Sequence, residues 1–584
     1  MLRSQIAARG VAVLSLWVAL STFCLGSCKP KEADTAISVL NVPIESDIQG
    51  FDPAIITDNY TMVALEQVYQ GLTQYDYYAR PYKVVPLLVK SMPTISPDRL
   101  VYTFQLREDV FFHEDPAFGG KPRKLTASDV VYSLKRIADP RVKSPNWWML
   151  EGRIVGLDEF RVALGKAKGT PNYDSSRVAG LSAPDDKTVV IKLIKPYRQL
   201  LYILALHPFG VLSPEVVAKY GDELINHPVG TGPYVLKEWI RGQRIGFSKN
   251  EKYWKEIDSR TGRQLPEPDE INLWIYPETQ PMWLNFLKGN LDVLDVVSEL
   301  QDLVFQKDGT AVPELKRRQI EPTVFERVDT VFLGFQMQDK IVGSNKYLRQ
   351  AISAAIDRNE LIKLFWSVKD REAHGPIAPG VFGYNEDLRN PYGYDLDHAR
   401  RLIEKAKQAA GVRTFPPIKL HLMSSSWHRQ LGEALGQQLR KIGLNLNVEL
   451  HPWPRLQELM EKRQVQMFLY SWTADYPDAE NFLQLFYGPN AAPATNRSCF
   501  QNSGFDSLYK EIQADEDSPE RKERINRVVQ IIMEEMPLIP LVHRSAPRAV
   551  QGWVSNFRLN PFARGGYKYV VVDAKRKVSL AARK

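Results

Sequence analysis

The sequence predicts an α/β protein built from two or three domains. Segments with strand-like and helix-like patterns alternate along the whole chain, which is typical of α/β architectures. The chain has 584 residues, of which 44% are hydrophobic, and this length exceeds what one hydrophobic core usually organises. We therefore expect a globular protein with more than one core.

The first half of the chain is predicted to open with a strand at 39–42 and a helix at 60–70, which ends at Gly71. Large apolar residues recur at every second position over 100–106, the period of a half-buried strand. A helix then begins after Thr126, a residue type that commonly caps helix N-termini. Further strands are predicted on either side of a Gly/Pro-rich turn at 227–234, over 187–193 and 245–248.

The second half of the chain repeats this alternation. Long helices are predicted over 347–364 and 396–409. Strand-like segments follow, separated by helical stretches such as 427–442, and lie at 420–422, 444–450 and 467–470. This order predicts a second open α/β unit. Late strands that we expect to pair back with the first unit lie at 537–542 and 569–572.

The N-terminal segment 1–27 has the layout of a lipoprotein signal peptide. Arg3 and Arg9 precede an apolar run at 11–25 that is shorter than the ~20 residues a membrane-spanning helix needs. Small residues stand directly before Cys28, which predicts cleavage there and acylation of that cysteine. The protein is then expected in the cell envelope, outside the cytoplasm and tethered to a membrane. The alternatives are an ordinary signal peptide with a chance cysteine, or an uncleaved anchor.

Cysteine usage and charge narrow the classes of function. Cys24 would leave with the signal and Cys28 would carry lipid, so Cys499 alone remains and no internal disulfide is expected. The formal net charge is +8, and basic residues cluster only in the C-terminal segments 575–577 and 583–584. Such a short run fits a solvated tail better than a nucleic-acid-binding arm. We expect no nucleic-acid partner.

Five motifs in fixed order resemble the family 5 extracellular solute-binding proteins, the large periplasmic peptide-binding proteins of ABC importers. The motifs are YTFQLR at 102–107, LTASDVVYS at 125–133, GTGPY at 230–234, LRQAI at 348–352 and WTADYPD at 472–478. Each motif alone is weak, but all five stand in the family's order with approximately matching spacing. The resemblance covers nearly all of the chain after the signal.

The resemblance implies a fold and a domain map. The fold is an α/β, two-lobed periplasmic-binding-protein-like clamp (type II-like) with an additional small α+β domain on the first lobe. The map comprises a polar leader at 28–35, lobe one at 36–80, 207–305 and 536–584, the additional domain at 81–206, and lobe two at 306–535. A ligand that touches both lobes would stabilise the closed clamp, and the membrane permease would read that closure.

The resemblance also implies a ligand site around Asp475. In the family's peptide binders, the aspartate at this position pairs with the ligand's α-amino group. A desolvated amine needs a counter-charge, and a carboxylate supplies charge-assisted hydrogen bonds. Trp472 and the backbone of Ser471 and Thr473 would hold the first residue of an extended ligand. The alternative for Asp475 is a helix N-cap or a turn carboxylate before Pro477.

Two further candidates come from the first lobe. Thr57 and Asp58 fall where the family offers groups to the ligand, although a plain loop or helix cap explains them equally well. His113 and Asp129 lie in well-matched motifs, and we interpret them as structural. The sequence lacks the arginine that some oligopeptide binders carry just upstream of Trp472, so it identifies no partner for a ligand carboxylate.

The predicted function is therefore a monomeric lipoprotein that captures short peptides and delivers them to the membrane subunits of an ABC permease. The same fold could instead bind a metal chelate, haem or an oligosaccharide. An enzyme is not expected, because zinc-protease, phosphate-binding and nucleophile-turn motifs are missing, although Asp475, Asp478 and Glu480 could mimic a glycosidase pair. An adhesin or chaperone on the same clamp has no feature of its own. The nine histidines are scattered, none pairs at ligand spacing, and no metal or cofactor is expected.

Overall fold

The structure is a computed structural model that describes residues 37–56, 58–166, 173, 176–562 and 565–581. The predicted signal peptide, the polar leader, Cys28 and Thr57 lie outside the described residues. Among the described residues, no helix combines the length and the apolar character that crossing a membrane requires.

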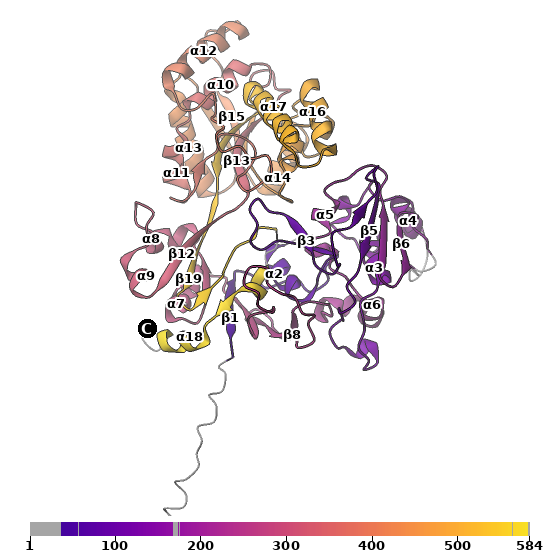
Figure 1. The fold of residues 1–584 in the computed structure, drawn as a ribbon. Coiled ribbons are helices and arrows are strands. Elements are labelled where there is room, and N and C mark those ends of the chain that lie inside the picture. The colour runs from indigo at the N-terminus through magenta and orange to yellow at the C-terminus, as the bar shows by residue number, and fades with distance from the viewer. Residues whose placement is uncertain (1–36, 57, 167–172, 174–175, 563–564, 582–584) are drawn as a thin grey trace, which may run out of the picture.

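The chain forms two bodies that are joined by two extended connections (Figure 1). In the first connection, β12 (Ile320–Glu326) of the lower body runs into β13 (Asp329–Phe335) of the upper body. In the second, β18 (Leu538–His543) of the upper body runs into β19 (Ser545–Gln551) of the lower body. We call 329–543 the upper body and the remaining described residues the lower body.

A six-stranded sheet organises the upper body, in the order β14-β18-β13-β17-β15-β16. Its remaining strands are β14 (Arg371–Glu372), β15 (Ile418–Met423), β16 (Leu446–His451) and β17 (Met467–Thr473). The surrounding helices are α10 (Lys346–Ala355), α11 (Arg358–Phe365), α12 (Leu396–Ala410), α13 (Ser426–Arg440), α14 (Trp453–Glu461), α15 (Ala479–Leu483), α16 (Ser503–Ala514) and α17 (Pro519–Glu535). Strand β13 is buried at every position, as a central strand should be.

The lower body contains a four-stranded sheet and smaller sheets. The four-stranded sheet has the order β1 (Val39–Ile44), β10 (Glu270–Ile275), β9 (Arg244–Lys249) and β8 (Tyr234–Ile240). A three-stranded sheet has the order β11 (Val293–Asp295), β19 and β12. The two-stranded sheets pair β2 (Thr73–Tyr75) with β3 (Val84–Pro86) and β20 (Val554–Ser555) with β21 (Val571–Val572). The helices are α2 (Asn59–Val68), α6 (Pro214–Tyr220), α7 (Thr279–Lys288), α8 (Gln301–Val304), α9 (Pro313–Arg317) and α18 (Ala574–Ala581).

A smaller α+β unit projects from the lower body, at the right of Figure 1. Its sheet has the order β4 (Thr94–Ile95), β5 (Val101–Gln105), β7 (Thr188–Lys192) and β6 (Leu181–Asp185), and its helices are α3 (Ala127–Ala138), α4 (Leu157–Lys166) and α5 (Leu200–Ile203). The unit has its own hydrophobic core. A buried ion pair, Arg136 with Asp52 at 2.6 Å, ties α3 to the segment ahead of α2.

Two expectations are wrong in detail. The single helix predicted over 347–364 is two helices, because Asp357 leaves the helical conformation and accepts a hydrogen bond from the backbone N of Glu360 as the N-cap of α11. The late strand predicted at 537–542 pairs with β13 in the upper sheet, not with the first unit. Strand β12, in turn, pairs with β19 in the lower body. We therefore place the two connections between the bodies at residues 327–328 and 544, and we call them the first and second crossing.

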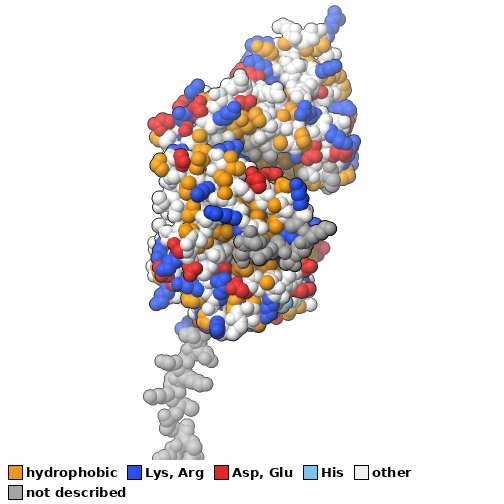
Figure 2. Space-filling view, turned by 90° about the vertical axis from the view of Figure 1, so that its right-hand side faces the viewer, with side chains coloured by type: hydrophobic (Ala, Val, Ile, Leu, Met, Phe, Trp, Pro, Cys, Tyr) orange, Lys and Arg blue, Asp and Glu red, His pale blue; other side chains and the backbone are white. Residues whose placement is uncertain are grey.

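Charged side chains of both signs are interspersed over the face shown in Figure 2. This agrees with the modest net charge of the sequence.

Candidate ligand-binding site

Asp475 lies in the loop between β17 and α15, where Asn481 fixes its position. The side-chain Nδ2 of Asn481 donates to Oδ2 of Asp475 over 2.9 Å. The side-chain Oδ1 of Asn481 accepts from the backbone N of Asp475 at 3.0 Å and from Nε1 of Trp472 at 2.8 Å. Asn481 is fully buried, so it is a rigid support for both predicted site residues. Sequence reasoning missed Asn481, although it stands six positions after Asp475.

The carboxyl group of Asp475 faces no cation among the described residues, and Asn481 is its only hydrogen-bond donor there. Burial raises the pKa of Asp475, the Asn481 hydrogen bond lowers it, and the nearby Glu480 raises it. Burial is also the main cause that raises the pKa of Tyr75 and Tyr197, and the charge of Asp475 adds to both. Both tyrosines belong to the lower body and Asp475 belongs to the upper body. The charge of Asp475 therefore acts on ionisable groups of the other body.

The N-cap of α15 is Asp478, not Asp475. Asp478 accepts a hydrogen bond from the backbone N of Glu480 at 2.9 Å, and Arg521 of α17 donates to it at 2.7 Å. Both members of this ion pair are fully buried. The helix end is therefore satisfied without Asp475, and the N-cap alternative for that residue fails.

The edge of β17 beside Asp475 is open over its last residues. β17 pairs with β13 along its whole length, but with β15 only at Met467 and Phe468. The backbone N of Ala474 donates to the carbonyl of Val328, which lies on the β13 side. Backbone groups alternate between the two sides of a strand, so those of Ser471 and Thr473 point to the open side. Both residues are exposed.

A row of aromatic rings connects the two bodies next to this loop. Phe562 and Tyr75 have ring centroids 5.2 Å apart, Tyr75 and Tyr202 are 6.3 Å apart, and Tyr202 and Tyr476 are 6.1 Å apart. All three pairs are stacked, and Tyr476 directly follows Asp475. The row thus brings an apolar surface from the lower body to the position of Asp475.

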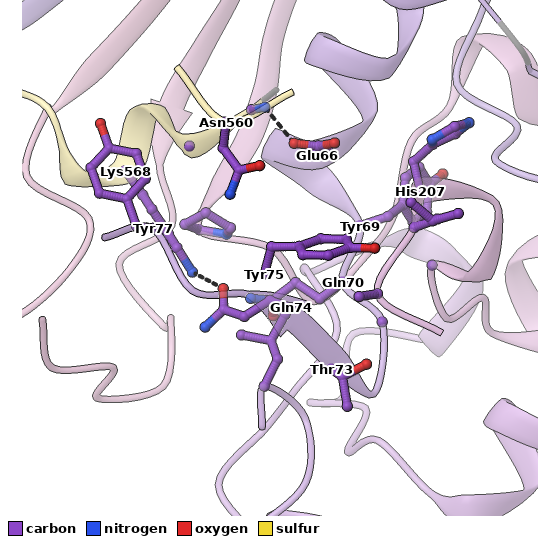
Figure 3. Close-up of a pocket in the computed structure, with 18 of the residues that line it drawn as sticks. Glu66, Tyr69, Gln70, Thr73, Gln74, Tyr75, Tyr77, His207, Asn560 and Lys568 are labelled. Carbon is purple, nitrogen blue, oxygen red and sulfur yellow. Dashed lines mark hydrogen bonds between the residues drawn. The ribbon is translucent and has the colours of Figure 1, made fainter. Parts of the chain in front are cut away.

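Tyr75 also lines a pocket of the lower body, where it lies at the centre of Figure 3 with Lys568 and His207 on opposite sides. Lys568 is already paired: its Nζ lies 2.7 Å from both carboxylate oxygens of Glu256 and donates to Gln74 at 3.0 Å. The pocket therefore offers no unpaired ammonium group at this position to a ligand carboxylate.

Polar contacts from the small unit also reach the upper body. Arg198 lies 2.6 Å from Asp517 and 3.5 Å from Asp478. Gln199 donates to Glu480 at 3.2 Å, and Glu480 also accepts from the hydroxyls of Tyr476 and Tyr509. Because Asp478 and Glu480 are buried and engaged in these contacts, they are not placed to act as the acid and nucleophile of a glycosidase.

The other predicted residues lie elsewhere. Asp58 is the N-cap of α2 and accepts from the backbone N of Thr61 at 2.9 Å, while its second oxygen is buried without a partner among the described residues. His113 and Asp129 make contacts inside the lower body: His113 Nε2 lies 3.0 Å from the carbonyl of Gly232, and Arg123 donates to Asp129 at 2.7 Å. Thr57 lies outside the described residues.

Three arginines that the sequence interpretation did not single out gather at the crossings. Arg544 pairs with Asp329 at 2.7 Å and Arg548 pairs with Asp295 at 2.5 Å. Arg327 lies 3.3 Å from Asp329 and is half exposed.

The sequence model of one protein family, described as bacterial extracellular solute-binding proteins, family 5 Middle, matches residues 83–494 of this chain. The chain belongs to this family. Family 5 proteins are solute-binding proteins of ABC importers and are not enzymes, so the resemblance inferred from the five motifs is confirmed and the hydrolase alternative fails. The family is extracellular or periplasmic.

Curated relatives of this family 5 protein bind different solutes. The di/tripeptide-binding protein 2 of Pseudomonas aeruginosa is 25% identical over 551 residues, 91% of this chain and 95% of its own. The heme-binding protein A of Haemophilus influenzae is 25% identical over 537 residues, 90% of this chain and 91% of its own. A glutathione-binding protein of Escherichia coli is 26% identical over 536 residues, 89% and 92% of the two chains.

Solved structures confirm the α/β clamp fold. HbpA2 from Haemophilus parasuis is 23% identical with a TM-score of 0.76 and covers 92% of this chain and 100% of its own. The unliganded open form of the murein tripeptide-binding protein MppA is 19% identical with a TM-score of 0.73, covering 92% and 97%. DppA from Helicobacter pylori in complex with the peptide STSA is 24% identical with a TM-score of 0.66, covering 92% and 98%.

Proposed function

We propose that this protein captures short, extended peptides between its two bodies and delivers them to an ABC permease. The observation that carries the proposal is a carboxyl group that no cation of the described residues approaches, at the end of an open strand edge. Asp475 has one oxygen held by Asn481 and lies two residues after the exposed Thr473, and Ser471 is exposed as well. An α-amino group at Asp475 would supply the missing charge.

The open edge of β17 fits a ligand with a regular backbone. An extended peptide that enters beside Ser471 and Thr473 would add a strand, and main-chain hydrogen bonds of this kind do not read side-chain identity. Trp472, held by Asn481, would border the first ligand residue. The di/tripeptide-binding relative supports a ligand of this class, and glutathione, bound by another relative, also carries an α-amino group. Haem lacks an amine and would leave Asp475 without a role.

Arg327 is our candidate for the carboxylate at the other end of a short ligand. Its neighbour Val328 accepts the hydrogen bond from Ala474, so Arg327 begins close to the Asp475 loop. Arg544 and Arg548 are each held by a carboxylate at 2.7 Å or less, whereas Arg327 is half exposed and its contact with Asp329 is longer. Guanidinium groups bind carboxylates through paired hydrogen bonds.

We also propose that Cys28 carries a lipid and anchors the protein at the outer side of a membrane, with the signal peptide removed. The four residues from Leu25 to Cys28 support this assignment. Intact mass of the protein extracted from membranes should show a chain that begins at Cys28 and carries acyl groups. A Cys28→Ser variant should leave the membrane fraction, and retention of that variant in membranes would contradict the anchor.

Thr57 and Asp58 stay predicted ligand contacts.

Native mass spectrometry of the protein as purified tests the ligand class directly. A bound mass that fragments into amino acids would support the proposal, and a bound haem or sugar would refute it. Added tripeptide should raise the melting temperature, because a ligand at 100 times its Kd stabilises the folded state by about 2.7 kcal/mol. No stabilisation by any of a panel of di-, tri- and tetrapeptides would count against peptide capture.

A further inference from the structure

Two histidines that are thirty positions apart in the sequence meet on neighbouring strands of the upper sheet. β15 and β16 pair in parallel, and their register sets His421 opposite Glu449 and Met423 opposite His451. Glu449 and His451 are two residues apart on one strand, so their side chains share a face, and the register puts His421 on that face too. Sequence spacing could not show this group, because a parallel pairing is non-local.

The three side chains converge on one point. His421 Nδ1 lies 3.1 Å from His451 Nε2 and 3.5 Å from Oε2 of Glu449, and His451 Nε2 lies 3.9 Å from the same oxygen. Tetrahedral zinc ligands at about 2.0–2.1 Å from the metal are about 3.3 Å apart. We propose that His421, His451 and Glu449 bind a divalent cation of the zinc class, separately from the peptide site.

The environment of His421 suits a metal ligand. His421 is buried, and a neutral imidazole nitrogen offers a lone pair to a metal ion. Its other ring nitrogen, Nε2, has no hydrogen-bond partner among the described residues, so no partner fixes the proton on one nitrogen. Without metal, the 3.1 Å contact fits an N–H···N hydrogen bond, and zinc would replace that proton.

The group is also accessible. The side chains of Glu449 and His451 are 28% and 18% exposed, which leaves room for an ion to enter and for water as the fourth ligand. Two histidines, one glutamate and a water form a known zinc ligand set. Both strands are fixed in the sheet, and α14, which starts two residues after His451, packs close to β15. The ligands are thus held by regular secondary structure.

One residue opposes the ion. Lys419 lies 3.1 Å from Oε1 of Glu449, with its side chain 53% exposed. The ammonium group occupies the oxygen that does not face the histidines, so it does not block the site, but its charge repels a divalent cation. The arrangement therefore predicts that removal of this lysine strengthens metal binding.

Titration of the tag-free protein with ZnCl₂ by calorimetry, at low ionic strength and without peptide, tests the proposal. We expect one zinc ion per chain, with an affinity that falls at least tenfold in His451→Ala and in Glu449→Gln. His398→Ala, which removes a histidine of α12 in the same body, should bind as the wild type does. Lys419→Gln should bind zinc severalfold more tightly. An anomalous diffraction peak between the three side chains would locate the ion.

Equal zinc affinity in the wild type, His451→Ala and Glu449→Gln would overturn the proposal, as would an anomalous peak elsewhere. Weaker or unchanged binding by Lys419→Gln would overturn the assigned position next to Glu449. Both ligand variants alter partly exposed positions, and each should keep the far-ultraviolet circular dichroism of the wild type. Should His451→Ala lose that signal, Glu449→Gln, which keeps the side-chain volume, decides the outcome.

Discussion

Asn481 holds Asp475 through two hydrogen bonds, from Nδ2 to a carboxylate oxygen at 2.9 Å and from the backbone N of Asp475 to Oδ1 at 3.0 Å. The same amide oxygen accepts from Trp472. One buried side chain therefore positions both the proposed amine partner and its aromatic neighbour, and no described residue donates a hydrogen bond to the second oxygen of Asp475.

Substitution of Asn481 should weaken peptide binding without removing the charge of Asp475. We expect Asn481→Ala to lower peptide affinity about tenfold and to destabilise the fold by about 1–3 kcal/mol, because buried donors lose their acceptor. Calorimetry and urea unfolding measure the two effects. Asn359→Ala, at an exposed position of α11, is the control and should change neither. Wild-type affinity in Asn481→Ala would contradict the positioning role.

The raised pKa of Asp475 predicts a pH dependence with a definite sign. The folded state holds the proton of Asp475 more tightly than the unfolded chain does, so the empty protein gains stability as pH falls through the raised pKa towards the ordinary value near 3.9. Asp475→Asn lacks this dependence and should melt at a higher temperature than the empty wild type at pH 7. A melting-temperature difference that stays constant between pH 7 and pH 4 would contradict this prediction.

Peptide affinity should change with pH in the opposite sense. The proposed ion pair needs ionised Asp475, so affinity should fall as pH decreases through the raised pKa of that group, above the range of an ordinary aspartate. Calorimetric titration of one tripeptide from pH 8 to pH 4 measures this. Constant affinity over that range would mean that Asp475 does not carry the ligand's charge.

The ion pair at the second crossing should matter for stability. Asp329 is fully buried, and Arg544 reaches it with Nε at 2.9 Å and Nη2 at 2.7 Å. Arg544→Leu leaves this carboxylate with Arg327 as its remaining cation and should cost about 3 kcal/mol of unfolding free energy. Arg317→Ala, which breaks an exposed pair with Glu314, should cost less than about 1 kcal/mol. Equal denaturation midpoints for the two variants would argue against a structural role of the pair.

The proposed role of Arg327 separates two kinds of ligand. Arg327→Gln should reduce affinity for a free tripeptide about tenfold, yet leave affinity for the C-terminally amidated form unchanged, since only the first presents a carboxylate. Arg317→Gln, another exposed arginine, serves as the matched control. An equal loss for both ligands would show that Arg327 acts on the fold and not on the carboxylate.

Local sequence patterns predicted some elements of this structure correctly. The alternation at 100–106 predicted β5, and the cap at Thr126 predicted the start of α3. The sheet membership of β18 was mispredicted because its residues are buried throughout, and such a strand fits the interior of either sheet. The split at Asp357 was missed because the apolar periodicity runs on through it.

The candidate site divides in the same way. Asp475 and Trp472 were predicted through a contiguous motif. Asn481 lies only six positions after Asp475, but its role shows only in the hydrogen bonds of the folded loop. Tyr75 and Tyr202 come from distant segments that only the fold brings to this loop. The side-chain contact between His421 and His451 depends on the register of two parallel strands, which no local sequence pattern shows.

One calorimetric comparison tests the central claim most directly. It measures the affinity of the wild type and of Asp475→Asn for one tripeptide, first with a free amine and then with an N-acetylated amine. The wild type should bind the free peptide at least a hundredfold more tightly than the acetylated one, and Asp475→Asn should lose most of that preference, whereas Asp397→Asn on the surface of α12 should keep it. A wild type that binds both peptides equally, or an Asp475→Asn variant that keeps the full preference, would contradict the account.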